Sequence, residues 1–157
     1  MISIRRLEVH VVPGTVPEAE DQPYPTVEFT LDGRTLQDWV RRSTPARREP
    51  QHYLGHHVSV DLAALLSGGL AYPPDDEPGE FRWEQWGGFT PILGCTCTDI
   101  ECGPLLCRIA VSDDRVTWTD LQDGFREELD YGLAFSFERG AYDAAVAAGL
   151  AELCSSL

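Results

Sequence analysis

Strand-forming segments follow one another through the second half of the chain without a helix between them. Residues 104–111 (PLLCRIAV) and 115–121 (RVTWTDL) flank the turn-forming triplet at 112–114, which predicts a β-hairpin. The aromatic segment 81–95 precedes this hairpin, and residues 133–139 (LAFSFER) follow it with alternating apolar side chains. Such a succession favours an antiparallel sheet over a doubly wound fold.

The rest of the chain predicts further strands and three helices. Apolar alternation predicts strands at 2–12 and 27–31, and capping signals with helical spacing predict short helices at 34–42 and 59–69. A longer C-terminal helix is predicted by apolar residues that recur at helical spacing: Tyr142, Ala145, Val146, Gly149, Leu150 and Leu153. We therefore expect an α+β fold with a single, mostly antiparallel sheet of about five to seven strands. Two short helices and the longer C-terminal helix would pack on that sheet.

The length of the chain fits one domain. The 157 residues are enough to bury a core, so we expect residues 1–157 to form a single domain. Polar segments that contain proline predict exposed loops near 13–26, 43–52 and 72–80.

The net charge of the chain limits the classes of partner that it can bind. The sequence has 26 acidic residues and 12 basic ones, all arginine, which gives a net charge of −14. This charge repels nucleic-acid phosphates and anionic membranes, so we expect neither as a partner. Two interpretations stay open: the acidity keeps the protein in solution, or it meets a basic protein partner.

The sequence also predicts where the protein resides. The N-terminal apolar run is broken by Glu8 and His10 and does not form a signal-peptide core. No stretch approaches the roughly 18 apolar residues of a membrane span. We expect a cytoplasmic protein, in which cysteines are thiols or metal ligands and stable disulfides are rare.

Four of the five cysteines fall within residues 94–107, GCTCTDIECGPLLC. Strand parity places Cys107 on the apolar face of its strand, which predicts a core residue. Cys95 and Cys97 lie two apart and share one side of a strand, and a turn after Cys102 brings the third thiol toward them. The segment therefore predicts either a plain hairpin without a cofactor or a zinc site.

A closed zinc site needs a fourth ligand. The candidates are His52, His56, His57, Asp99 and Cys154, among which His56 belongs to the segment HYLGHH. A redox role for the thiols is less favoured, because the neighbouring acids disfavour thiolates and no C-x-x-C pair occurs.

An aromatic cluster precedes the cysteines. Phe81, Trp83, Trp86 and Phe89 lie within nine residues and are followed or interrupted by glycines. They predict either core packing or a surface for a partner, since tryptophan is enriched at binding hot spots.

The run ILGCTCTDIECGPLLCRI, followed by RVTWTDL and LAFSFERGAYDAAV, resembles a group of small bacterial proteins of uncharacterised function. The similar pattern covers residues 93–150 and their margins. Thr98 and Glu101 stand where the group has glycines, and Cys107 lies outside the pattern. The resemblance implies a shared fold; it implies no activity, cofactor or catalytic residue.

Three functional hypotheses follow from the sequence. Since no phosphate-binding loop, nucleophile elbow or metalloprotease motif occurs, the favoured one is a non-catalytic acidic interaction protein, such as an immunity protein or antitoxin. The alternative is a structural zinc-binding domain that uses Cys95, Cys97 and Cys102. The third is an enzyme of unrecognised type with a histidine from residues 52–57 as its acid or base.

Overall fold

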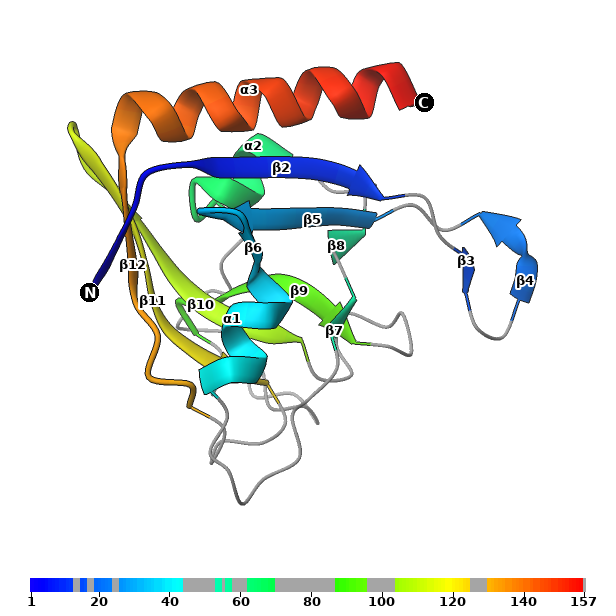
Figure 1. Ribbon diagram of the computed structural model, residues 1–157, viewed down its shortest axis with the longest axis horizontal. Coiled ribbons are helices and arrows are strands. Elements are labelled where there is room, and N and C mark those ends of the chain that lie inside the picture. The colour runs from blue at the N-terminus through cyan, green and yellow to red at the C-terminus, as the bar shows by residue number, and fades with distance from the viewer. Residues whose placement is uncertain are drawn as a thin grey trace.

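The computed structural model describes most of the chain: residues 1–12, 15–16, 19–23, 26–43, 53–54, 56–57, 62–69, 87–95, 104–124 and 130–156. These residues contain three helices and two main β-sheets, and the predicted α+β class is confirmed at this level. The longest helix, α3 (Arg139–Ser156), runs along the strand β2 (Leu7–Val12) at the top of the view in Figure 1.

The larger sheet has six strands within the described part of the chain. Their order is β1 (Ile2–Ile4), β12 (Phe135–Glu138), β11 (Arg115–Asp123), β10 (Leu105–Val111), β9 (Thr90–Cys95) and β7 (Tyr53–Leu54). Neighbouring strands are antiparallel except β1 and β12, which are parallel. The predicted hairpin is confirmed as β10 and β11, and the backbone N–H of Ser112 donates to the carbonyl of Arg115 across its turn at 2.8 Å.

The second sheet is built on the pairing of β2 with β5 (Thr26–Leu31). The short strands β6 (Arg34–Thr35) and β8 (His56–His57) also pair with β5. A separate hairpin of β3 (Thr15–Val16) and β4 (Ala19–Pro23) lies where the sequence predicted the loop 13–26. Apolar alternation does not mark these strands, because β3 has only two residues and β4 is polar (AEDQP). Of the loop predicted at 43–52, only Ser43 is described, as the last residue of helix α1 (Leu36–Ser43), and the loop predicted at 72–80 lies outside the described residues.

The prediction of a single sheet is wrong, because the predicted strand 2–12 is divided between the two sheets. The Asp32 carboxylate accepts hydrogen bonds from the backbone N–H groups of Arg5 (2.9 Å) and Arg6 (2.8 Å). The chain turns there out of β1 and into β2. Asp32 has φ 51°, a left-handed conformation that aspartate adopts more readily than most residues. Apolar alternation marks a strand but does not indicate which sheet the strand joins.

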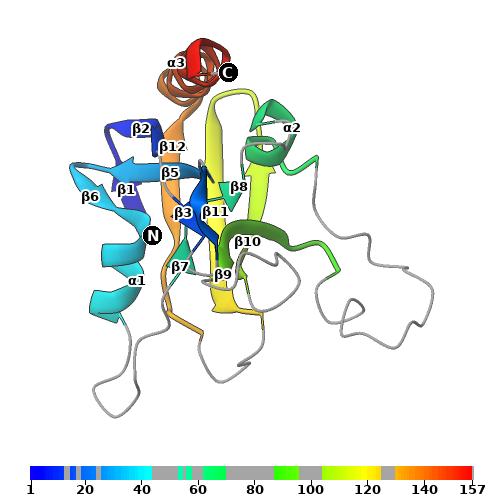
Figure 2. The ribbon, with the colours of Figure 1, turned by 90° about the vertical axis from the view of Figure 1, so that its right-hand side faces the viewer.

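The two sheets are joined at two corners. The chain continues from β1 into β2 through Arg5 and Arg6, and one residue separates β7 from β8. Because β7 pairs with β9 and β8 pairs with β5, the strand pairings follow a closed circuit around the core. Figure 2 shows β2, β5 and β6 on one side of this circuit and β10–β12 on the other.

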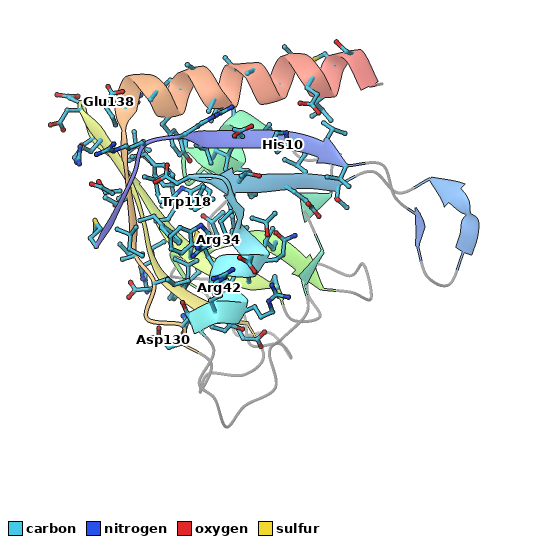
Figure 3. All side chains as sticks on the ribbon, in the orientation of Figure 1. His10, Arg34, Arg42, Trp118, Asp130 and Glu138 are labelled. Atoms are coloured by element: carbon cyan, nitrogen blue, oxygen red, sulfur yellow. The ribbon has the colours of Figure 1, made fainter. Side chains whose placement is uncertain are left out.

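Four rings from both sheets and α3 form the aromatic centre of the core: Phe29, Trp118, Phe137 and Tyr142. Trp118, labelled in Figure 3, is fully buried, and its ring contacts each of the other three. Its ring centroid lies 5.0 Å from that of Phe137, 5.6 Å from that of Phe29 and 6.3 Å from that of Tyr142. These rings therefore hold the two sheets and α3 together.

Helix α3 is fixed at its start and along its inner face. The Glu138 carboxylate accepts hydrogen bonds from the N–H groups of Ala141 (2.7 Å) and Gly140 (2.9 Å), which have no partner within the helix. These two bonds hold the pKa of Glu138 below its ordinary value. Farther along, Gly149 lies against Val9 of β2, where an added Cβ would be 2.6 Å from the valine Cγ1. The predicted apolar stripe of this helix is confirmed.

The other two helices, α1 (Leu36–Ser43) and α2 (Leu62–Leu66), are short and bury leucine side chains in the core. Among the helices in the described residues, none has the length and apolar character that a membrane span requires.

Candidate functional site

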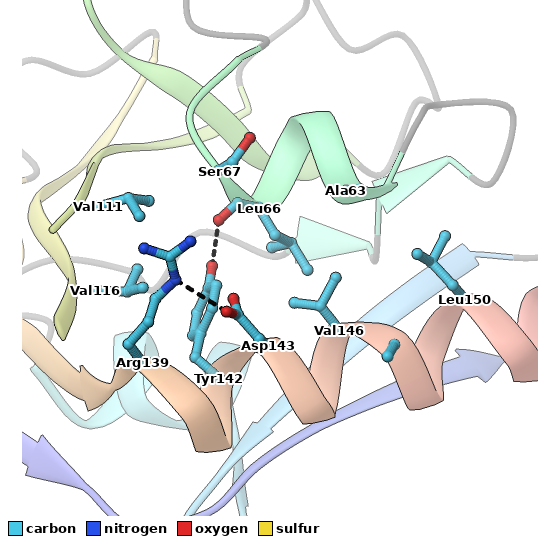
Figure 4. Close-up of a pocket in the computed structure, with 11 residues that line it drawn as sticks. Ala63, Leu66, Ser67, Val111, Val116, Arg139, Tyr142, Asp143, Val146 and Leu150 are labelled. Atoms are coloured by element: carbon cyan, nitrogen blue, oxygen red, sulfur yellow. Dashed lines mark hydrogen bonds and ion pairs between the residues drawn. The ribbon is translucent and has the colours of Figure 1, made fainter. Parts of the chain in front are cut away.

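A groove lies between α2, α3 and the turn of the β10–β11 hairpin (Figure 4). Its volume is about 230 Å³, and it is open to the surface. Apolar side chains form most of its lining: Ala63, Leu66, Val111, Val116, Val146, Ala147 and Leu150. We call this feature the α2–α3 groove.

The walls of the groove leave apolar surface uncovered. Val111 is 40% exposed, at the end of a strand that is buried only at residues 105–107. Val146 and Leu150 are half-buried on α3, and the alanines at 63 and 147 are exposed. Side chains of this kind favour contact with a partner over contact with water.

The floor of the groove is held by the Tyr142 hydroxyl. It donates a hydrogen bond to the carbonyl of Leu66 at 2.5 Å and accepts one from the Trp118 indole N–H at 3.1 Å. Burial raises the pKa of Tyr142 well above its ordinary value. A hydroxyl that is engaged twice and remains protonated suits a fixed strut between α2 and α3 better than an acid or base.

One end of the groove is closed by Arg139. Its Nε lies 3.0 Å from Asp143 Oδ2, and its NH1 donates to the carbonyl of Ser112 at 2.7 Å. Its backbone N–H donates to the carbonyl of Asp114 at 2.9 Å. The first turn of α3 is thereby tied to the β10–β11 turn. The ion pair is partly exposed, since the two side chains are 36% and 58% accessible.

The charged groups around this end are mainly acidic. Asp113 and Asp114 are exposed in the hairpin turn, and Asp143 lies opposite them on α3. Residues 62–69 carry no charge, and residues 140–156 carry only Asp143 and Glu152. The groove therefore offers apolar contact beside an acidic end.

The structure describes only part of the predicted zinc site. Cys95 ends β9, where its backbone pairs with Tyr53, while Cys97 and Cys102 lie outside the described residues. His56 lies in β8 and pairs with Val27. The described residues contain no group of three or more potential metal ligands. Zinc binding stays a prediction.

The histidine segment and Cys107 differ in how far the structure describes them. His52 is outside the described residues, and His57 pairs with Thr26 through its backbone. Cys107 is fully buried in the core as predicted, and burial strongly raises the pKa of its thiol. This thiol therefore stays protonated and unreactive.

Of the predicted aromatic surface, the structure describes only Phe89. That ring is 6% exposed, packs with Leu106, and lies 4.1 Å beneath the guanidinium of Arg108. At this position the structure agrees with the core-packing alternative and not with an exposed docking residue. The other three, Phe81, Trp83 and Trp86, lie outside the described residues.

The groove residues themselves were missed in the sequence. Strand parity predicted Val111 on the apolar face with Cys107, yet Val111 sits beyond the part of the strand that the core covers. An apolar residue directly before the polar turn 112–114 was the available signal. Arg139 and Asp143 are four residues apart on one helix face, a spacing that also indicates an ion pair.

No family model, curated protein or solved structure matches the chain. The predicted resemblance to small bacterial proteins therefore stays a prediction, and the functional proposal rests on the geometry.

Proposed function

We propose that the protein is a non-catalytic, acidic interaction protein whose α2–α3 groove binds a basic protein partner. The observation that supports this is one surface on which uncovered apolar side chains adjoin exposed aspartates. An immunity protein or an antitoxin that meets a basic toxin is the type of role we propose.

The size of the groove supports a protein partner over a small ligand. Small-molecule sites commonly enclose about 300–1,000 Å³ and bury most of the ligand. The groove holds about 230 Å³ and is open along the surface. A few apolar side chains from a partner would fill it and bring their flanking residues to its rim.

The charge distribution supports a basic partner. The described segments hold 14 of the 26 acidic residues and 8 of the 12 arginines. The remaining segments hold the other 12 acidic residues and the other 4 arginines. Acidic residues therefore exceed arginines by 6 in the first set and by 8 in the second. A field of one sign raises the association rate of an oppositely charged partner and disfavours partners of like charge.

The test uses two amphipathic peptides of about 18 residues, or five helical turns. Both carry leucine and alanine on one face, and the other face carries arginine in one peptide and glutamate in its counterpart. Fluorescence anisotropy measures the binding of each labelled peptide to the full chain. We expect the arginine peptide to bind, with an affinity that falls as salt rises, and the glutamate peptide not to bind.

Two matched variants locate the binding. Ala147 lines the groove, whereas Ala144 is exposed on the same helix outside the groove. Ala147→Arg should weaken binding about tenfold or more, because it fills the groove and repels arginine, while Ala144→Arg should change it less than about twofold. Equal effects of the two variants, or equal binding of both peptides, would contradict the proposal.

Zinc binding is the second candidate function. One observation favours it: the pairing of Tyr53 with Cys95 brings the histidine-bearing segment 52–57 alongside the first of the three cysteines. Elemental mass spectrometry of the purified protein tests it. One zinc per chain that is lost in Cys97→Ser but retained in Cys154→Ser would support a site at Cys95, Cys97 and Cys102. A metal-free protein would exclude it.

A further inference from the structure

The end of the α2–α3 groove already holds one arginine, and that arginine belongs to the protein itself. The Arg139 guanidinium contacts the Asp143 carboxylate, as Figure 4 shows, and also donates to the Ser112 carbonyl. Two acceptors from two different elements therefore converge on it. A planar guanidinium with five N–H donors suits such a pair of acceptors better than a lysine ammonium does. The end of the groove is thus shaped for an arginine.

The arginine in this place is weakly held. Both members of the ion pair are partly exposed. Exposed ion pairs contribute little to stability, because solvent screens them and holding the two side chains in one geometry costs conformational entropy. The backbone of Arg139 is tied separately, through its N–H, to the carbonyl of Asp114. The guanidinium can therefore swing away while the start of α3 stays in place.

The elements that flank the groove favour one way of binding. A peptide that binds as an added strand needs a free sheet edge, and β11 offers none because it pairs with both β10 and β12. The partner strand β9 covers β10 only at residues 105–107, so near the groove β10 pairs with β11 alone among the described strands. The groove runs between two helices, so an amphipathic helix that lays its apolar face between them is the favoured form of the partner segment.

We propose that the groove takes an amphipathic helix with an arginine at one end of its apolar face, and that this arginine displaces Arg139 from Asp143. This inference rests on the proposed function. In the free protein, Arg139 then occupies the place that the partner's arginine takes in the complex. The carboxylates of Asp113, Asp114 and Asp143 attract the positive charge of that arginine. The exchange gives the protein a selective preference for arginine over lysine at that position of the partner.

The test compares three variants with the arginine peptide. Arg139→Gln removes the internal competitor and should tighten binding about two- to fivefold, the range that an exposed ion pair allows. Arg115→Gln makes the same change of net charge at the neighbouring turn, outside the groove lining, and should change binding less than about 1.5-fold. In an Asp143→Asn background, Arg139→Gln should no longer tighten binding.

Failure of this inference is distinct from failure of the proposed function. If the wild-type protein binds neither peptide, the proposed function itself fails. If it binds the arginine peptide but Arg139→Gln and Arg115→Gln act equally, the groove binds without the exchange and the inference is overturned. A peptide with lysine in place of its terminal arginine gives a further check: equal affinity for both peptides would contradict the exchange.

Discussion

The aromatic centre and the α2–α3 groove share Tyr142 but differ in how far their side chains are buried. In the aromatic centre, Trp118 contacts three rings and its indole N–H is bonded to the tyrosine hydroxyl. In the groove, about one and two turns farther along the same helix, Val146 and Leu150 stay half-buried. We therefore expect the stability of the fold to depend mainly on the first region, and the proposed binding to depend on the second.

Helix α3 shows this division along its length. Its inner face is held so closely that Gly149 leaves no room for a side chain against Val9. Its groove face carries small or half-buried apolar residues such as Ala147. Substitutions on the inner face should therefore lower the free energy of unfolding, whereas substitutions on the groove face should alter binding and leave stability nearly unchanged.

The largest expected effect comes from the aromatic centre. Trp118→Ala removes a fully buried ring that contacts both sheets and α3, and should lower the free energy of unfolding by about 3–5 kcal/mol. Urea denaturation followed by circular dichroism measures it. A loss below about 1 kcal/mol would mean that the core does not depend on this centre.

The second effect compares the two faces of α3 directly. Gly149→Leu forces a side chain into the contact with Val9 and should destabilise the protein by about 3 kcal/mol. The neighbouring substitution Ala148→Leu introduces the same side chain on the exposed face and should change stability by less than about 0.5 kcal/mol. Similar losses in both variants would show that α3 does not pack as described.

The third effect tests the shared tyrosine. Tyr142→Phe keeps the ring but leaves the Trp118 N–H and the Leu66 carbonyl without their partner, which should cost about 2 kcal/mol. The same variant should also weaken peptide binding, because α2 loses its tie to α3. An unchanged unfolding midpoint would indicate that the hydroxyl is not a strut.

The smallest effect concerns pH at the start of α3. The N–H groups of Ala141 and Gly140 lower the pKa of Glu138 below its ordinary value of 4.5. A carboxyl group of this kind stabilises the folded state fully above its unfolded pKa, and this contribution is lost as pH falls through the folded pKa. The Tm of the wild type should therefore exceed that of Glu138→Gln near neutral pH. The difference should shrink as pH falls below 4.5, and a difference independent of pH would contradict this role.

The sequence predicted the parts of the fold that local signals determine. Apolar alternation marked β10, β11 and β12, helical spacing marked α3, and parity placed Cys107 in the core. The division into two sheets was missed because it depends on Asp32. Its carboxylate accepts hydrogen bonds from the backbone N–H groups of Arg6 and Arg5, which lie 26 and 27 positions earlier in the chain. No periodicity in the chain reports such a contact.

The groove was missed for the same reason. Its two walls meet because the Tyr142 hydroxyl bonds to the carbonyl of Leu66, 76 residues earlier in the chain. The spacing of Arg139 and Asp143 fits an ion pair but says nothing of what lies beside it. Composition left a basic partner as one of two interpretations of the acidity, and it could not locate a surface for one.

The most direct test of the central claim is a ¹H–¹⁵N NMR titration of the full chain with the arginine peptide. We expect shift changes to concentrate in residues 62–69, in the turn 111–115 and on the groove face of α3, with the Arg139 side-chain N–H signal moving as its contact to Asp143 is replaced. Residues of the aromatic centre other than Tyr142 should change little. Shift changes confined to other surfaces would contradict the assignment of binding to the groove. The absence of any shift change, at a peptide concentration that saturates binding in the anisotropy measurement, would contradict it too.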